Sequence, residues 1–298
     1  MEKLLQLCRV AINAVSAVVE EENEEENQFG YTLHLEQTAF AGLIFISKED
    51  GYCLFRSYAP LRGRHQALVE AAVAANADLV SGSFARECAF DPDEQTIAFE
   101  TYIHHPEELN PTAFIARLRR NRDLFAFCLP LLEAVAVGEL EPHDFNRQLR
   151  EATRRRPLEE SRAPERQEGF SDAQFDTHVS FSRGRAAHCE IVSPLDGLAI
   201  PYARVTSIAG FCLDAQRLGH FGSFAWPELG EGDEPLQFQT ICWGPANTQR
   251  ERVSIFAARH REALAACLPL LEALASETLE QAEAEAALLA LARARHWV

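Results

Sequence analysis

Adjacent histidine and cysteine side chains are the residues of this chain that could bind a metal ion. His104 and His105 look like a ligand pair, but neighbouring residues on a strand point to opposite faces and cannot readily share one ion. We therefore interpret them as a surface pair. His188 and Cys189 lack the second pair of ligands that zinc spacing requires. The sequence predicts no metal site.

Two serines that follow glycine are the candidates for a nucleophile. Neither Ser83 nor Ser223 lies in a Gly-x-Ser-x-Gly motif, and both precede alternating apolar residues, which indicates the start of a strand. No glycine-rich phosphate loop is present. Asp91 and Asp93 imitate only the start of a calcium loop, so a turn is favoured there. We expect a protein that is not an enzyme and uses no cofactor.

The chain repeats itself after 139 residues. The heptapeptide Cys-Leu-Pro-Leu-Leu-Glu-Ala begins at Cys128 and again at Cys267. At a spacing of 140, the tetrapeptide Gly-Ser-Phe-Ala occurs at 82–85 and at 222–225. Solenoid repeats run at roughly 20 to 50 residues, so a period this long indicates a duplicated domain.

Composition limits the class of protein and its partners. The 298 residues suffice for two domains of ordinary size, and 47% hydrophobic against 24% charged residues indicates packed cores. The net charge of −17 repels phosphate backbones and anionic lipid surfaces. We therefore expect neither nucleic acid nor a membrane as the partner.

The cysteines and the N-terminus favour a cytoplasmic location. Eight cysteines are scattered without a Cys-x-x-Cys pair, which is typical of reduced, buried thiols. The first 19 residues could pass for a signal peptide, but Glu2 and Arg9 interrupt them and an acidic run follows. No apolar stretch is long enough to span a bilayer.

Hydrophobic periodicity predicts the elements that position these residues. An amphipathic helix over 1–20 is followed by an acidic segment, 20–26, which we interpret as a solvated connection. The first half then predicts strands at 31–35, 42–47 and 52–57, a helix at 64–80, two strands over 84–90 and 97–103, and a helix at 114–135. Asp50-Gly51 predicts a hairpin turn between the second and third strands.

The helix at 114–135 and its copy at 253–274 share three features. Asn121 and His260 are polar at the same point of each apolar stripe, so we expect them where the helix leaves the core. Pro130 and Pro269 predict a kink or a restart in each helix. Four arginines lie opposite the first stripe, on a face that is solvated or salt-bridged or, alternatively, contacts an acidic partner: Arg117, Arg119, Arg120 and Arg122.

We therefore predict an α+β protein of two repeated domains, each an antiparallel sheet packed with helices. The expected boundaries are 1–156 for the first copy, 157–172 for a linker and 173–298 for the second copy. The second copy has no clear first helix unless 144–155 serves both. Because one chain carries both domains, their effective concentration is high, and we expect them to pack as a pseudo-dimer.

Several segments of the first copy resemble the Tir chaperone family, the small acidic chaperones of type III secretion. They are Arg56 to Leu61, Ala67 to Ala71, Ala75-Asn76, Gly82 to Phe84, Phe90 to Glu94 and Ile97 to Phe99. The resemblance covers most of 1–137 and is weaker over 175–275. It implies a cytoplasmic, acidic homodimer that holds the N-terminal segment of a secreted effector in extended form. The tandem duplication departs from that family.

The resemblance places the partner against the first helix and first strand. An extended peptide could add to a sheet edge there, with alternate side chains in apolar pockets. The residues we expect to bind the partner are Leu4, Leu5, Ile12, Val19, Leu33 and Leu35, with Val179 and Phe181 in the second half. Ordinary core residues are the other interpretation of this set. The alternative function is a regulatory or scaffolding protein of YbjN-like fold, unrelated to secretion.

Overall fold

The fold comes from a computed structural model, which describes most of the chain. The described residues are 2–15, 17–25, 28–35, 40–47, 51–79, 82–87, 94–104, 106, 110–155, 166–171, 176–181, 188–218, 222–227, 235–243 and 246–294. The predicted turn at 91–94 and His105 lie wholly or mainly outside them. Gly51 has a φ of 66°, as the predicted hairpin turn requires.

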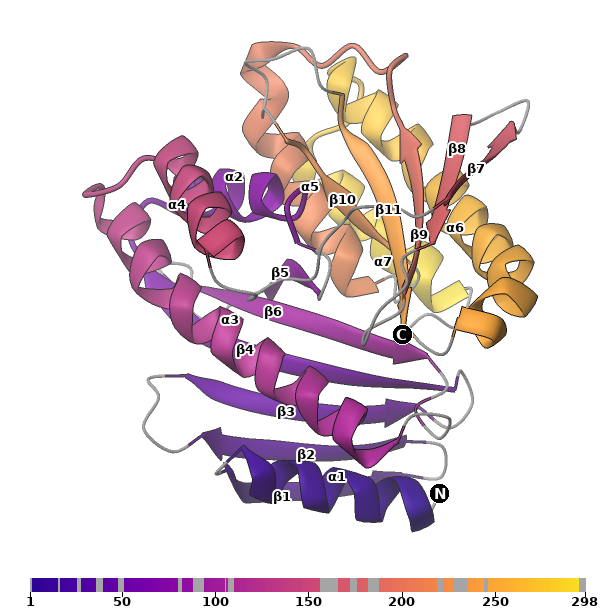
Figure 1. The fold of residues 1–298 in the computed structure, drawn as a ribbon. Helices are drawn as coiled ribbons and strands as arrows, with labels where there is room; N and C mark the ends of the chain where they lie inside the picture. The colour runs from indigo at the N-terminus through magenta and orange to yellow at the C-terminus, as the bar shows by residue number, and fades with distance from the viewer. Residues whose placement is uncertain are drawn as a thin grey trace.

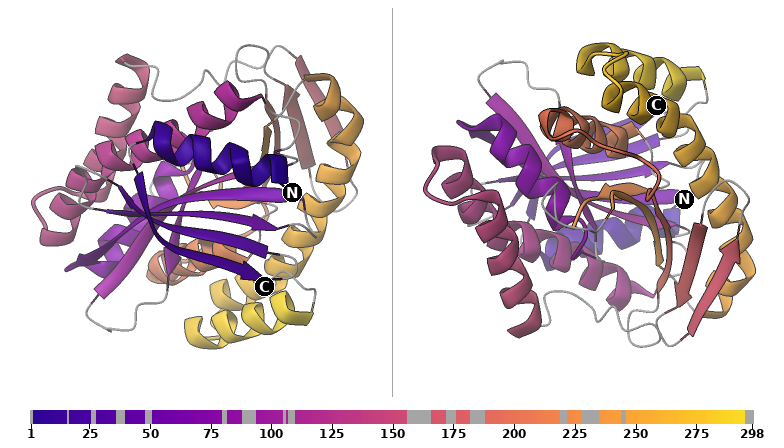
Figure 2. Two further views of the ribbon diagram at one scale, coloured as in Figure 1. Left: turned by 90° about the horizontal axis from the view of Figure 1, so that it is seen from below. Right: turned by 90° about the horizontal axis from the view of Figure 1, so that it is seen from above.

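The first half of the molecule is one six-stranded antiparallel sheet, here sheet A, with helices against it (Figure 1). Its elements are α1 (Glu2–Ala14), β1 (Ala17–Glu25), β2 (Gln28–Leu35), β3 (Ala41–Ser47), β4 (Tyr52–Arg62), α2 (His65–Ala75), β5 (Ser83–Glu87), β6 (Glu94–His104), α3 (Pro111–Val137) and α4 (Pro142–Arg155). The strand order is β1-β2-β3-β4-β6-β5. Helices α1 and α3 cover one face, which we call the inner face (Figure 2).

The second half repeats this order in a five-stranded antiparallel sheet, sheet B (Figure 1). Its elements are β7 (Arg166–Ser171), β8 (Asp176–Phe181), β9 (His188–Pro194), the 3₁₀ turn η2 (Tyr202–Arg204), α5 (Val205–Leu218), β10 (Ser223–Ala225), β11 (Gln237–Trp243), α6 (Ala246–Ala275) and α7 (Gln281–Ala294). The strand order β10-β11-β9-β8-β7 matches β5-β6-β4-β3-β2. The predicted α+β class with two repeated units is confirmed. Within its described residues the second half has no counterpart of α1 or β1.

The boundary between the halves differs from the prediction. The range expected to be a linker, 157–172, contains β7, which pairs with β8 along its whole length. Helix α4 does not replace a missing helix of the second half, because Phe145 and Leu149 bury its apolar side in the shared core and α4 contacts α2 and α3. Its counterpart at the 139-residue spacing is α7.

The acidic segment after α1 is a strand and not a solvated connection. Residues 17–25 form β1, which pairs with β2 from Ala17 opposite Leu35 to Glu25 opposite Gln28. Glutamate has low strand propensity, yet an edge strand tolerates charge because one side faces water. Its hydrogen-bonded pairing with β2, and not its own strand propensity, makes this segment a strand. The helix before it accordingly ends at Ala14, earlier than predicted.

The long helices α3 and α6 run through their prolines without a restart. Pro130 lies inside the 27-residue α3 and Pro269 inside the 30-residue α6. A proline frees the carbonyl four residues before it, here that of Ala126 or Ala265. Both alanines and both prolines are exposed, so water can satisfy the freed carbonyls. The position of each proline on the solvent side explains why the predicted restart is absent.

The two halves share one hydrophobic core, centred where α2 packs against α5. Asn76 at the end of α2 joins them: its Nδ2 donates to the carbonyl of Phe84 in β5 at 3.2 Å and to that of Phe224 in β10 at 3.3 Å. Gln239 of β11 donates back to the Asn76 carbonyl at 2.8 Å. The strands β5 and β10 therefore lie at the junction of the halves, as Figure 1 shows.

Candidate partner-binding surface

A buried polar cluster links α3 to sheet A in the first half. Asn121 accepts a hydrogen bond from Ser57 Oγ at 2.7 Å. Its Nδ2 donates to the carbonyls of Phe55 and Phe99 and to Thr101 Oγ1, at 3.0 to 3.2 Å. Asn121 is 1% exposed. One side chain thereby fixes the helix to two adjacent strands, β4 and β6.

The second half has a cluster at the same place whose geometry resembles a catalytic triad. Ser193 Oγ lies 3.0 Å from Nε2 of His260, and Thr240 Oγ1 lies 2.8 Å from Nδ1. Nucleophile, base and orienting group would occur in that order. Burial, with a smaller contribution from Arg261, lowers the pKa of His260 to about 3. A base of that strength is poorly matched to proton transfer near neutral pH.

The repeat identifies this cluster as a structural connection. His260 occupies the position of Asn121, and Thr240 that of Thr101, at the 139-residue spacing. An asparagine cannot act as a base, and both clusters are closed to solvent. The expectation that Asn121 and His260 lie where the helices leave the core was wrong. Strand hydroxyl groups facing each helix provide their partners inside the core.

His104, another candidate metal ligand, also has a structural role. His104 is buried and its ring packs on Phe256 of α6 at 5.3 Å between centroids, so it is not a surface residue. Among the described residues, no three His, Cys, Asp or Glu side chains are grouped closely enough to hold a metal ion. No described helix is both long and apolar enough to cross a bilayer.

The arginines of α3 contact the end of the first helix. Arg119 donates from Nε and Nη2 to the carbonyl of Ala14, and Arg122 donates from Nη1 to that of Val15. These carbonyls lie at the C-terminal end of α1, where the helix dipole is negative. Two members of the arginine group therefore cap α1, and Arg122 also pairs with Asp123, in agreement with the salt-bridged face expected there.

Most residues predicted to bind a partner lie in the core. Leu4, Ile12 and Leu33 are at most 9% exposed and pack between α1 and the inner face of sheet A, and Val179 is fully buried. These four side chains do not form a surface. Leu5 is partly buried against the same core, whereas Val19 is 38% exposed. The side chains of Leu35 and Phe181 lie outside the described part.

The outer face of sheet A, opposite to α1 and α3, contains a hollow that was not predicted from the sequence. The hollow has a volume of about 180 Å³. Its lining comes from the first three strands: Glu21, Asn23, Phe29, Gly30, Thr32, Leu43 and Phe45. The apolar run at 43–46 contained the signal, because four consecutive apolar residues on a strand supply both faces. Ile44 and Ile46 enter the core, while Leu43 and Phe45 stay half-buried outside.

The strand beside the hollow is the outer edge of sheet A. In the described chain β1 pairs with β2 alone, and Val18, Glu20, Glu22 and Glu24 of β1 are exposed. The register shifts between Val19 and Glu21, as at a β-bulge. An exposed edge offers backbone N–H and C=O groups to another extended segment. Edge and hollow together can hold a strand and one of its side chains.

A buried ion pair stiffens the same outer face towards β6. Arg56 of β4 pairs with Glu100 of β6, with 2.7 Å between Nε and Oε1, and the hydroxyl of Tyr102 donates to Glu100 Oε2 at 2.9 Å. Burial, together with the negative charge of Glu100, raises the pKa of Tyr102 well above its usual value. The tyrosine therefore stays protonated as the donor.

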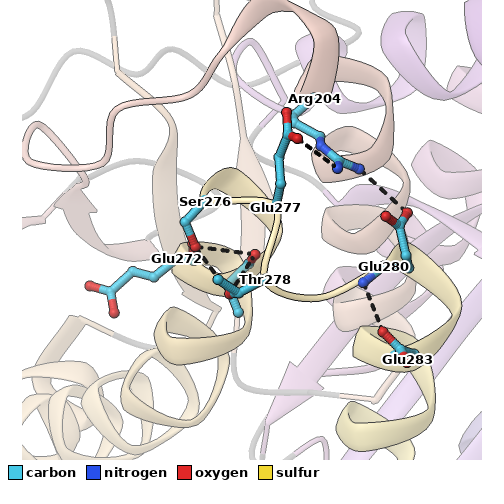
Figure 3. A network of polar contacts seen from close by, with 8 residues as sticks. Arg204, Glu272, Ser276, Glu277, Thr278, Glu280 and Glu283 are labelled. Carbon is cyan, nitrogen blue, oxygen red and sulfur yellow. Dashed lines mark hydrogen bonds and ion pairs between the residues drawn. The ribbon is translucent and has the colours of Figure 1, made fainter.

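Ion pairs also fix the turns before the last helix of each half. In the second half Arg204 of η2 pairs with Glu277 and Glu280 at 3.5 and 3.4 Å, as Figure 3 shows. In the first half Arg64 pairs with Glu141 at 3.0 Å. The glutamates Glu141 and Glu280 are counterparts at the 139-residue spacing. The acids of these pairs are exposed, and the pairs belong to the repeated architecture, not to a site.

Comparison with known proteins leaves the family open. No protein-family model, curated protein or solved structure matches the chain.

Proposed function

We propose that this is a non-enzymatic binding protein of the type III secretion chaperone kind, which holds an extended N-terminal segment of a secreted effector in the cytoplasm. The observation that carries the proposal is the exposed edge strand β1 beside the hollow on the outer face of sheet A. The packing of both halves on one core supports a pseudo-dimer within one chain.

The edge and the hollow suggest how the segment is held. An added strand would exchange main-chain hydrogen bonds with β1, and one of its apolar side chains would enter the hollow against Leu43 and Phe45. The glutamates of β1 favour basic residues in the bound segment. This mode replaces the predicted contacts with Leu33 and its neighbours, which are core residues.

A larger side chain in place of Gly30 would fill the hollow. A Cβ atom at this position meets no heavy atom within 4 Å, and its φ lies outside the left-handed region. Gly30→Leu is therefore expected to fold normally and to abolish partner binding, because the new side chain occupies the space of the partner's. Gly197→Leu is the matched control, since a Cβ there also meets nothing within 4 Å.

The test begins with partners that co-purify with the tagged wild-type chain and are identified by mass spectrometry. Binding of a synthetic peptide from the partner is then measured by calorimetry for the wild type and both variants. Loss of binding with Gly30→Leu alone supports the proposal. Equal binding by all three proteins places the site elsewhere, and partners without secretion signals favour the YbjN-like scaffolding alternative.

A further inference from the structure

A cluster of one guanidinium and two carboxylates connects the two halves. Arg86 of β5 donates from Nε to Asp214 Oδ1 of α5 at 2.9 Å, and its Nη2 contacts the other oxygen of the same carboxylate. The same Nη2 donates to Glu285 Oε1 of α7 at 2.9 Å. Gln281, one turn earlier in α7, donates to Glu285 at 2.7 Å. A side chain of the first half thus binds two acids of the second.

The cluster occurs on one side of the junction only. At the 140-residue spacing the counterpart of Arg86 is Trp226, and the counterpart of Asp214 is Ala74. At the 139-residue spacing the counterpart of Glu285 is Asn146. These three counterparts carry no charge, and Trp226 and Ala74 are buried. Beside them, Arg150 of α4 pairs with Asp78 and donates to the carbonyl of Pro227 at 3.4 Å. The three-residue cluster is therefore not part of the repeated architecture.

The balance of charge around Asp214 makes its carboxyl sensitive to protons. With both acids ionised the cluster carries a net negative charge, and Asp214 is 9% exposed. Its pKa is raised to about 7, first because burial disfavours the anion and also because Glu285 repels it, while Arg86 acts in the opposite direction. This carboxyl therefore gains or loses its proton near neutral pH.

Among the side chains that the structure describes, few other charged groups face Asp214 from the elements packed on α5. The strand β10 (Ser223–Ala225) carries no charge. On α2, Glu70 accepts a hydrogen bond from Thr206, two turns before Asp214. Other described groups on these elements are buried thiols or are engaged elsewhere: Cys212 of α5, Cys267 of α6, and Arg204 of η2 with Glu277 and Glu280. Arg86 and Glu285 therefore dominate the environment of this carboxyl.

We propose that the Arg86–Asp214–Glu285 cluster is a proton-operated clamp, which holds the two halves more tightly when it binds a proton. A carboxyl whose pKa is higher in the folded than in the unfolded chain binds the proton more tightly when folded. Stability is therefore gained as the pH falls from about 7 towards 4, and is lost as the pH rises through neutrality. The clamp goes beyond partner binding and does not depend on it.

The first experiment compares urea unfolding midpoints of the wild type and Asp214→Asn from pH 5 to pH 8.5. The amide resembles the protonated carboxyl in shape and charge. We expect the wild-type midpoint to lie already below that of the variant at pH 5, the gap to widen up to about pH 7, and the difference to stay constant above it. His260 is common to both proteins, so its titration cancels in the difference. Parallel profiles would overturn the clamp.

A second variant tests the cluster without touching the most buried acid. Glu285 is partly exposed, so Glu285→Gln is expected to fold, and removal of its charge should lower the pKa of Asp214. The pH at which stability declines should then shift downward by a measurable fraction of a pH unit. No shift would show that Asp214 does not titrate as part of the three-residue cluster.

Amide hydrogen exchange at pH 8 localises the effect. We expect the amides of β5 and α5 to exchange several-fold faster in the wild type than in Asp214→Asn at the same pH, while those of β8 stay equal. Equal exchange at the junction, or a uniform change across both sheets, would contradict a clamp between the halves.

Discussion

The inner faces of the two sheets differ where the first half has α1 and the described part of the second half does not. In sheet A, Phe29, Tyr31 and Leu33 of β2 lie under α1 and are almost fully buried. The register of β7 on β8 gives their counterparts as Arg166, Glu168 and Phe170. Two of the three positions that are apolar in sheet A are thus charged in the sequence of the second half.

The long helices show the same difference. Arg119 and Arg122 of α3 cap α1, and their counterparts in α6 are Ala258 and Arg261, both exposed. Ile115, half-buried beside α1, corresponds to Ser254, which is exposed. In the described part of the second half, the absence of a helix like α1 therefore accompanies the loss of the apolar side chains that it would cover.

The largest effect that we predict concerns the buried polar residues of the two long helices, Asn121 in α3 and His260 in α6. Asn121→Leu should lower the free energy of unfolding by about 3 kcal/mol, because it removes four hydrogen bonds and leaves buried groups of β4 and β6 unpaired. His260→Leu removes two, so we expect a smaller loss of about 2 kcal/mol. Urea unfolding of both variants measures the difference. Equal losses would show that the two positions are energetically equivalent.

The side chain of one half can also be placed at the corresponding position of the other half. His260→Asn introduces the side chain that the first half uses, so it should be better tolerated than His260→Leu. The folded-state pKa of His260 is depressed to about 3 from 6.5, so the wild type loses stability as the pH falls from about 6.5 towards 3. The asparagine variant should not show this loss of stability at acid pH. Unfolding is best compared in the Asp214→Asn background, where the opposing titration is absent; identical losses at acid pH would refute the assignment.

The smallest effect concerns a residue with positive φ just beyond the end of each long helix. Gly138 and Glu277 are counterparts, with φ of 81° and 59°. A side chain in this left-handed conformation is strained, so Glu277→Gly should stabilise the protein by roughly 0.5 kcal/mol, less than the usual glycine advantage because the ion pair with Arg204 is lost. Gly138→Ala should destabilise it by about 1 kcal/mol. Thermal unfolding measures both, and changes of the same sign would contradict the strain argument.

Periodicity in the sequence was sufficient to predict most of the fold. The alternating steps of three and four residues located α3 and α6, and strand alternation located β2, β3, β4 and β6. The repeat supplied the second half. What periodicity could not predict was β1, whose glutamates disfavour a strand until β2 is present beside it.

The partner-binding surface was predicted less well, for a physical reason. Leu4, Ile12 and Leu33 were selected because they are apolar on an amphipathic helix and a strand, which are also the properties of core residues. The hollow depends on which face of a strand stays uncovered, as at Phe45, and this is a tertiary property. Asn121 was misplaced similarly, since its partners are distant in sequence.

The shared core has a consequence for how the two halves can diverge in sequence. In a homodimer of two identical chains, any substitution at the junction appears twice, on both sides of the symmetry axis. Here Ala74 and Asp214 occupy related positions independently, and so do Trp226 and Arg86. The covalent link therefore permits asymmetric specialisation, and it makes assembly of the halves unimolecular. Their association is insensitive to dilution, whereas a two-chain equivalent would dissociate as its concentration falls.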